Sequence, residues 1–236
     1  MDQRQKDLLN LIVCQYVKTA TPVGSKLVSQ DPRFNLSSAT IRNEMMALED
    51  AGYIYQPHTS AGRAPTLKGY EFYVANFLAD LDLAKPKQEF LRKAVQSFKT
   101  YEPTLVKQLA KGVAELASNT VFVGFSKADF YYTGLSNLFA QPEFNQHEFA
   151  YNISRVIDHF DRVLEKLFSL SDFEDDVEIL IGKKNPFGSE CGSVVVRYQI
   201  RNEPVVFGIL GPARMDYQNN FSLIKYSQSL INNFTK

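Results

Sequence analysis

The sequence has few of the residues that build disulfide frameworks, metal sites or thiol-based active sites. It contains two cysteines and three histidines among 236 residues. Cys14 lies in an apolar helical context and Cys191 in a loop-like segment, so they do not make a disulfide framework and indicate a reducing compartment. No Cys or His pairs stand at the spacing of metal ligands. We therefore expect no metal and no cofactor.

Long apolar runs and a secretion signal are also lacking. No run is long enough to span a bilayer, and the opening residues "MDQRQKDLLN" do not form a signal peptide. These absences predict a soluble, cytoplasmic protein.

The chain has no excess of either charge, because its 26 Lys and Arg residues balance 26 Asp and Glu residues. This balance argues against a non-specific polyanion binder as a whole. Charge is nevertheless segregated along the chain. Residues 84–112 contain seven basic and two acidic residues, whereas residues 129–180 contain three basic and eleven acidic residues. We interpret the acidic stretch as a solvated face.

Hydrophobic periodicity predicts helices in the N-terminal third. The expected helices cover residues 4–19, 26–30, 38–50 and 67–81, with a short strand over 53–58. Ser25, Ser37 and Thr66 are expected to cap three of these helices, and Gly52 to end one. The tight break between the second and third helices is typical of a helix-turn-helix.

The rest of the chain reads as two amphipathic stretches followed by a mixed region. Residues 80–118 are interpreted as a helical linker, docked on the second domain or forming a dimer contact. Strands are predicted over 120–126, 129–134, 177–182, 193–200 and 204–211, and helices over 148–170 and 217–234. The fold class is therefore α+β, with parts at 1–79, 80–118 and 119–236.

The third helix offers one face to a core and the other to a partner. Ile41, Met45 and Leu48 share the inward face. In the major groove of DNA, Arg reads guanine and Asn reads adenine, so this helix predicts base recognition. The candidate base-contacting residues are Arg42, Asn43, Ser38 and Ala39. An alternative is that Arg42 only pairs with Glu49 or faces solvent.

The segment "QPHTSAGRAPTLKGYEFY" supplies the Gly, Ser and Thr residues of a tight β-hairpin wing. Arg63 is expected at the tip, where it suits a narrow minor groove. His58 either contacts phosphate or caps the hairpin. The candidate backbone-contacting residues are Ser25, Ser37, Thr40, His58, Thr59, Ser60, Gly62 and Arg63.

Several long motifs resemble one family of bacterial regulators. "TPVGS", "SSATIRNEMMALEDAGYI" and "QPHTSAGRAPTLKGYEFYV" are similar to the N-terminal domain of the heat-inducible transcription repressors, the HrcA family. "TGLSNLFAQPEF", "IGKKNPFG" and "GILGPARMDYQNNFSLIKY" resemble its GAF-like effector domain. The resemblance implies a winged helix-turn-helix at 1–79 and a homodimer that binds an inverted-repeat operator of chaperone operons. It also implies release on heat stress and dependence on a GroEL-type chaperonin.

The chain departs from this pattern at one place. Between "LASNTVFVGFS" and "YYTGLSNLF" the family usually has further strands and an inserted dimerisation subdomain, whereas "KADF" alone joins the two here. The resemblance thus implies a reduced GAF-like domain at 119–236. The dimer contact is then expected at the amphipathic pair over 86–117 or on the second domain.

Two other functions were weighed. One is a winged-helix regulator whose GAF-like domain senses a small molecule, although "GPARMDY" reads as a structural turn tied by Arg214 and Asp216. The other is an enzyme with Cys191 as nucleophile and His147 or His159 as base. None of these histidines lies in a catalytic motif. The chain is therefore predicted not to be an enzyme.

Overall fold

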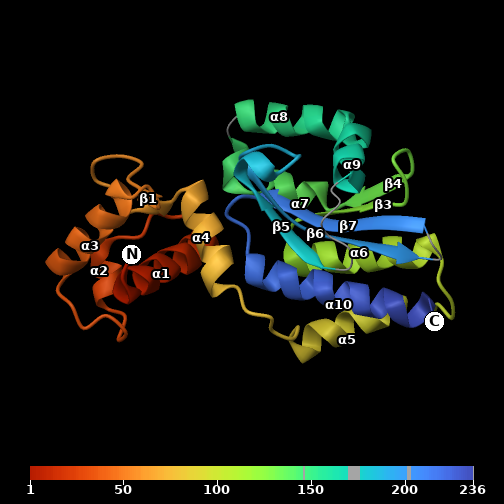
Figure 1. Cartoon of the computed structure of the whole chain (residues 1–236), viewed down its shortest axis with the longest axis horizontal. Coiled ribbons are helices and arrows are strands. Elements are labelled where there is room, and N and C mark those ends of the chain that lie inside the picture. Colours follow the sequence, from red (N-terminus) through yellow and green to blue (C-terminus); the bar gives the residue numbers. More distant parts are fainter. Residues whose placement is uncertain (146, 170–175, 201–202, 236) are drawn as a thin grey trace. The chain divides into compact units, whose positions relative to one another are not determined.

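The computed structural model describes residues 1–145, 147–169, 176–200 and 203–235 (Figure 1). The chain divides into two compact units, Met1–Leu78 and Ala79–Lys236. The segment 80–118, assigned above to a linker, belongs to the second unit, where it forms two packed helices. The boundaries of the functional domains stay a prediction.

The first unit combines helices with a two-stranded antiparallel sheet (Figure 1). Its elements are α1 (Gln3–Thr19), α2 (Ser25–Ser29), α3 (Ser38–Asp50), β1 (Ile54–Tyr55), β2 (Ala64–Pro65) and α4 (Leu67–Phe77). Ile54 of β1 pairs with Pro65 of β2. Leu9 and Ile12 of α1 are buried together with Ile41 and Leu48 of α3. The element order matches the prediction, but β1 and α4 are shorter than expected.

The helix caps of this unit agree only in part with the prediction. The Ser37 side chain accepts a hydrogen bond from the Thr40 backbone N–H, and the Thr66 side chain accepts one from Gly69, so both predicted caps are confirmed. The prediction for Ser25 was wrong. Gly24 is the N-cap of α2 and gives no side-chain bond. The Ser25 hydroxyl is instead paired with that of Ser38.

The second unit is built on an antiparallel sheet with the strand order β4-β3-β7-β6-β5 among the described residues. Its strands are β3 (Thr120–Gly124), β4 (Phe130–Thr133), β5 (Val177–Ile181), β6 (Cys191–Ile200) and β7 (Glu203–Pro212). β6 and β7 pair along their full length, from Cys191 opposite Pro212 to Ile200 opposite Glu203. Helix and sheet therefore mix as predicted.

Helices cover both faces of this sheet (Figure 1). One face carries α5 (Lys85–Val95), α6 (Pro103–Ala117) and α10 (Tyr217–Thr235), and the other carries α7 (Leu135–Phe139), α8 (His147–Asp158) and α9 (Phe160–Ser169). A short 3-10 turn, η1 (Pro142–Asn145), joins α7 to α8.

The apolar faces of α5 and α6 are covered within the chain. Leu91, Val95, Leu109 and Val113 are all buried, while Phe90 is 36% exposed. Of the two alternatives for this segment, the contacts agree with docking on the second unit, and the place of a dimer contact stays a prediction. The helices use their apolar faces to pack against each other and α10.

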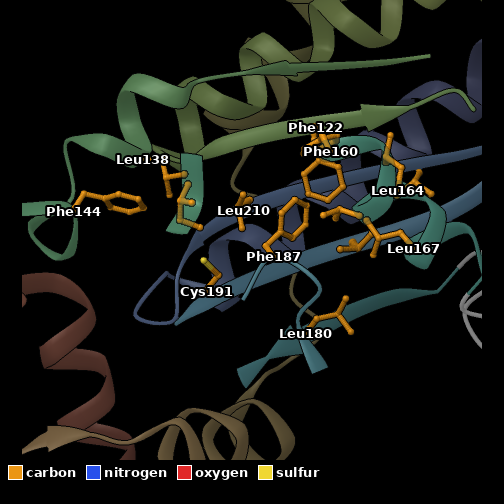
Figure 2. Close-up of a cluster of buried hydrophobic side chains, with 14 residues drawn as sticks. Phe122, Leu138, Phe144, Phe160, Leu164, Leu167, Leu180, Phe187, Cys191 and Leu210 are labelled. Atoms are coloured by element: carbon orange, nitrogen blue, oxygen red, sulfur yellow. The ribbon is translucent and has the colours of Figure 1, made fainter. Parts of the chain in front are cut away.

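The core between the sheet and α9 centres on three aromatic rings (Figure 2). The Phe122 ring lies 5.6 Å from Phe160 and 5.0 Å from Phe187, measured between centroids. The single helix predicted over 148–170 is in fact two, α8 and α9, separated at His159. This break lets Phe160 at the start of α9 enter the core, since its side chain is buried.

Candidate nucleic-acid interface

Helix α3 presents a polar face from a buried base. Ile41, Met45 and Leu48 are buried, as their spacing predicted. Ala39, Thr40, Arg42, Asn43, Met46 and Ala47 are exposed. Met46, a large apolar side chain, is 50% exposed. The outer face therefore offers one cation, one amide, one hydroxyl and apolar groups to a partner.

Hydroxyl groups fix the N-terminus of α3. The Ser37 hydroxyl lies 3.1 Å from the Thr40 backbone nitrogen, which donates to it, and 2.9 Å from the Thr40 hydroxyl. The Ser38 hydroxyl lies 2.9 Å from that of Ser25, at the first residue of α2. Because the Ser25 and Ser38 hydroxyls bond to one another, these candidate DNA-contacting residues also hold α2 against α3.

A carboxylate on the inner side of α3 ties the helix to α1. Glu44 pairs with Arg4 at 2.6 Å and accepts a hydrogen bond from the Gln5 side chain at 3.2 Å. The outer face of α3 thus stands on a helix that is held at its start and at its middle.

The loop between β1 and β2 has an internal support that the sequence did not reveal. The Gln56 side-chain amide donates to the backbone oxygens of Thr59 at 3.0 Å and Ala61 at 2.9 Å. The Ala61 backbone N–H donates to the His58 oxygen at 2.8 Å. His58, Thr59 and Ser60 form the exposed outer part of the loop.

The returning half of this loop is joined to the segment before α2. Val23 and Arg63 exchange backbone hydrogen bonds of 2.8 and 2.9 Å. Gly62 is required beside this contact, because a Cβ there would lie 2.4 Å from the Val23 carbonyl carbon and 2.5 Å from its oxygen. The loop is therefore tied to the segment that leads into α2.

Arg63 was predicted at the tip of the loop, and this prediction was wrong. The residue lies at the base of the loop, directly before β2. Its guanidinium pairs with Glu49 at 2.8 Å, and its side chain is only 13% exposed. Glu49 also accepts a hydrogen bond from the Gln56 backbone N–H. The alternative in which Glu49 pairs with Arg42 is thereby excluded, and Arg42 is exposed.

A groove of about 540 Å³ runs between α2, α3 and the loop. It is lined by the predicted residues Ser25, Arg42, Thr59, Ser60, Gly62 and Arg63. Ala39 and Asn43 are exposed on α3 but do not line the groove.

The lining of this groove also contains two long polar side chains that were not predicted, Lys26 and Gln56, together with Val23, Gly24, Met45 and Ala61. Lys26 directly follows Ser25, a predicted phosphate-contacting residue. This position next to Ser25 is the feature of the sequence from which Lys26 could have been predicted.

The cysteine of the second unit is not placed for catalysis. Cys191 was expected in a loop-like segment, but it is the first residue of β6 and is buried. Burial raises the pKa of its thiol to about 12, with a further contribution from Glu190. A thiol needs its ionised form to act as a nucleophile. This environment opposes the enzyme alternative. Within the described ranges no cluster of His, Cys, Asp or Glu residues has the arrangement of a metal site.

The segment "GPARMDY" is a structural turn, as predicted, although Arg214 does not bond to Asp216. The Arg214 guanidinium binds Glu143 at 2.6 Å and Gln141 at 2.8 Å. The Asp216 carboxylate accepts a hydrogen bond from the Asn219 backbone N–H in the first turn of α10. None of the described helices is both long and apolar enough to span a membrane.

Curated relatives share a single descriptive name. A "Heat-inducible transcription repressor HrcA" of Natranaerobius thermophilus is 43% identical over 124 residues, which span 52% of this chain and 36% of the relative. A protein of the same name from Clostridium tetani is 25% identical over 334 positions, spanning 95% of this chain and 93% of the relative. The first match thus spans little more than a third of its relative. The second alignment is longer than the 236 residues of this chain. The Clostridium tetani relative therefore has segments without a counterpart here.

The fold is shared with a solved structure described as a hypothetical protein. It matches with a TM-score of 0.77 at 20% identity and covers 100% of this chain and 99% of the other. The names of the relatives describe transcription repressors and not enzymes, as predicted. The family model described as the HrcA protein C-terminal domain matches residues 36–220. Since this match covers well over half of its length, the chain belongs to the HrcA family.

Proposed function

We propose that this chain is a transcription repressor of heat-inducible genes whose first unit is a winged helix-turn-helix that binds DNA. The observation that carries the proposal is the outer face of α3, where Arg42 and Asn43 are exposed on a helix locked to α1 and α2. A recognition helix must present such a face without moving, because base readout depends on geometry. The family name of the relatives supports the same function.

Each part of the first unit takes a role in this proposal. Arg42 and Asn43 contact base edges, with Ser38 and Ala39 beside them at the start of α3. Ser25, Ser37 and Thr40 approach phosphates, joined by Lys26 in the same groove. His58, Thr59 and Ser60 form the wing surface, and Gly62 allows the wing to join the segment before α2. Arg63, being paired with Glu49, supports the wing from behind.

The second unit is proposed as a reduced GAF-like effector domain that makes the active protein a homodimer. One recognition helix reads few base pairs, so two copies on an inverted repeat are needed for useful specificity. Because proteins are only marginally stable, unfolding of this unit on heating releases the operator, and a GroEL-type chaperonin restores the folded repressor.

The test begins with duplexes selected from a random pool by the full chain. On the selected sequence, Arg42→Ala should cost about 1–3 kcal/mol and relax the preference at one base position. Lys111→Ala serves as the charge-matched control, since Lys111 is exposed on α6 of the second unit. Equal weakening on every sequence would assign Arg42 to phosphate alone. A pool that yields no preferred sequence would overturn the repressor function.

The dimer and the heat response are tested on the same duplex. Sedimentation should show two chains on an inverted repeat and much weaker binding to a single half-site. Binding should fall in parallel with the loss of tertiary structure on heating, and chaperonin should increase its recovery. Full recovery of operator binding without chaperonin would contradict the proposed chaperonin partner. Binding of one chain per half-site without cooperativity would contradict the proposed homodimer.

A further inference from the structure

A second groove lies in the second unit, between the α8–α9 pair and the connection from β5 to β6. It has a volume of about 480 Å³. Its lining comes from the two helices and from residues 186–191. A neighbouring hollow of about 600 Å³ shares Lys166, Pro186, Gly188 and Ser189 with it. The two hollows are therefore adjacent, and together they are called the depression.

Positive charge gathers around this depression. Arg155, His159, Arg162 and Lys166 all line the first hollow and follow one another at spacings of four, three and four residues. Lys183 and Lys184 line the second hollow from the opposite side. Among the described residues of the lining, Glu190 is the carboxylate. No ion pair joins any of these Lys or Arg residues to a carboxylate among the described residues.

The floor of the first hollow is apolar. Ile153, Val163, Phe187 and Cys191 line it and belong to the buried core, in which Figure 2 shows Phe187 and Cys191. An apolar floor with a cationic rim is the arrangement that small-molecule sites use for affinity and orientation.

The loop between β5 and β6, opposite α9, is held in place by its own hydrogen bonds. Asn185 is 5% exposed and its side chain bonds in three directions. Its amide donates to the Leu180 oxygen at 3.2 Å, and its oxygen accepts from the Phe187 N–H at 3.1 Å and the Ser193 hydroxyl at 3.2 Å. Gly188 has a φ of 122°, which favours glycine. Lys183, Lys184 and Ser189 are therefore carried by a fixed frame.

We propose that this depression binds a small molecule bearing two or more phosphate groups, with its organic part over the apolar floor. Two guanidinium groups match the oxygens of phosphate through paired N–H donors, and lysines add charge without fixing orientation. The volume is that of a small-molecule site. The proposal is independent of operator binding, because its residues all lie in the second unit.

The probes are pyrophosphate and ADP, titrated by calorimetry into the full chain at about 0.1 M salt, where exposed charges are partly screened. Pyrophosphate should bind and lose affinity as salt rises, and ADP should bind more tightly if its ring reaches the floor. Arg162→Glu and, separately, Lys184→Glu should each weaken binding at least about tenfold. Lys111→Glu, on the opposite side of the sheet, should leave it unchanged.

Other results decide against the site or against the placement of the organic part over the apolar floor. Absence of pyrophosphate and ADP binding, or equal binding by Arg162→Glu and Lys184→Glu, would overturn it. Weakened operator binding by these variants with unchanged pyrophosphate binding would mark the depression as a DNA contact instead. Both variants change exposed side chains, so their thermal unfolding should match that of the parent. ADP binding equal to pyrophosphate binding would keep the site and place the organic part in solvent.

Discussion

The two units differ in the number of basic side chains that line a groove without pairing with a carboxylate. In the first unit Arg4, Arg33 and Arg63 each pair with a carboxylate, at 2.6, 2.7 and 2.8 Å. Arg42 and Lys26 stay exposed at its groove. In the second unit Lys93, Lys127, Arg214 and Lys225 also pair with carboxylates. Its unpaired cations gather around a depression whose described lining contains one carboxylate, Glu190. Pairing thus accompanies a structural role, as at Arg63 and Arg214, and unpaired cations line a groove in each unit.

This difference matters because exposed ion pairs contribute little to stability, whereas unpaired like charges repel. Clustered cations without a paired carboxylate need another reason to stand together, and an anionic ligand supplies it. A cation that is already neutralised, such as Arg63, has little left to offer an anion. The contrast therefore separates supporting residues from contacting residues in both grooves.

The largest effect is expected where the frame of the second groove is removed. Asn185→Ala leaves the Leu180 carbonyl, the Phe187 N–H and the Ser193 hydroxyl without their buried partner. Each buried polar group left unsatisfied costs about 1–3 kcal/mol, so the variant should lose roughly 3 kcal/mol of unfolding free energy. Urea unfolding measures this loss.

The matched control is Asn152→Ala, which removes an exposed amide from the lining of the same groove. It should change stability by less than about 0.5 kcal/mol. Equal stability of the two variants would show that Asn185 does not hold the loop.

A smaller effect is expected at the paired cation of the first groove. Arg63→Ala and Glu49→Ala should each cost about 1 kcal/mol of stability, with a similar coupling energy in the double-mutant cycle. The salt dependence of operator binding should stay unchanged in Arg63→Ala, because its guanidinium is already neutralised. In Arg42→Ala the slope should fall by about one unit if that side chain displaces a counterion.

The reverse pattern would break the comparison. A lower salt slope in Arg63→Ala with no loss of stability would place this guanidinium on DNA rather than on Glu49. Mobility-shift titrations at several salt concentrations, combined with urea unfolding, distinguish the two outcomes.

Local signals predicted the elements well, because they depend on neighbouring residues. The caps at Ser37 and Thr66 follow from side chains that reach N–H groups three residues away. The inward face of α3 follows from helical spacing. In the second unit all the strands appeared close to their predicted positions, since their β-branched runs are bounded by turn residues.

Contacts between distant segments were not predictable in this way. Nothing near Arg63 in the sequence points to Glu49, and the break at His159 depends on Phe160 entering a core made by other elements. The depression shows the same limit. Residues 129–180 are acidic in composition, yet their basic residues Arg155, Arg162 and Lys166 all line it. Composition averages over a stretch, whereas folding selects one face of a helix.

The smallest effect is expected at an exposed pair in the turn between α2 and α3. The Arg33 guanidinium and backbone N–H bond to the Asp31 carboxylate and lower its pKa to about 2. A depressed pKa means that the unfolded state binds the proton first, so this contribution is present above about pH 4 and is lost toward pH 2. In Asp31→Asn the urea midpoint of unfolding should therefore fall slightly less between pH 4 and pH 2 than it does in the parent. The control is Asp50→Asn, which changes an exposed carboxylate at the end of α3. If both variants follow the parent over that range, the exposed Asp31–Arg33 pair adds nothing to stability, and the stabilising pairs are the more shielded ones, Arg63–Glu49 in the first unit and Arg214–Glu143 in the second.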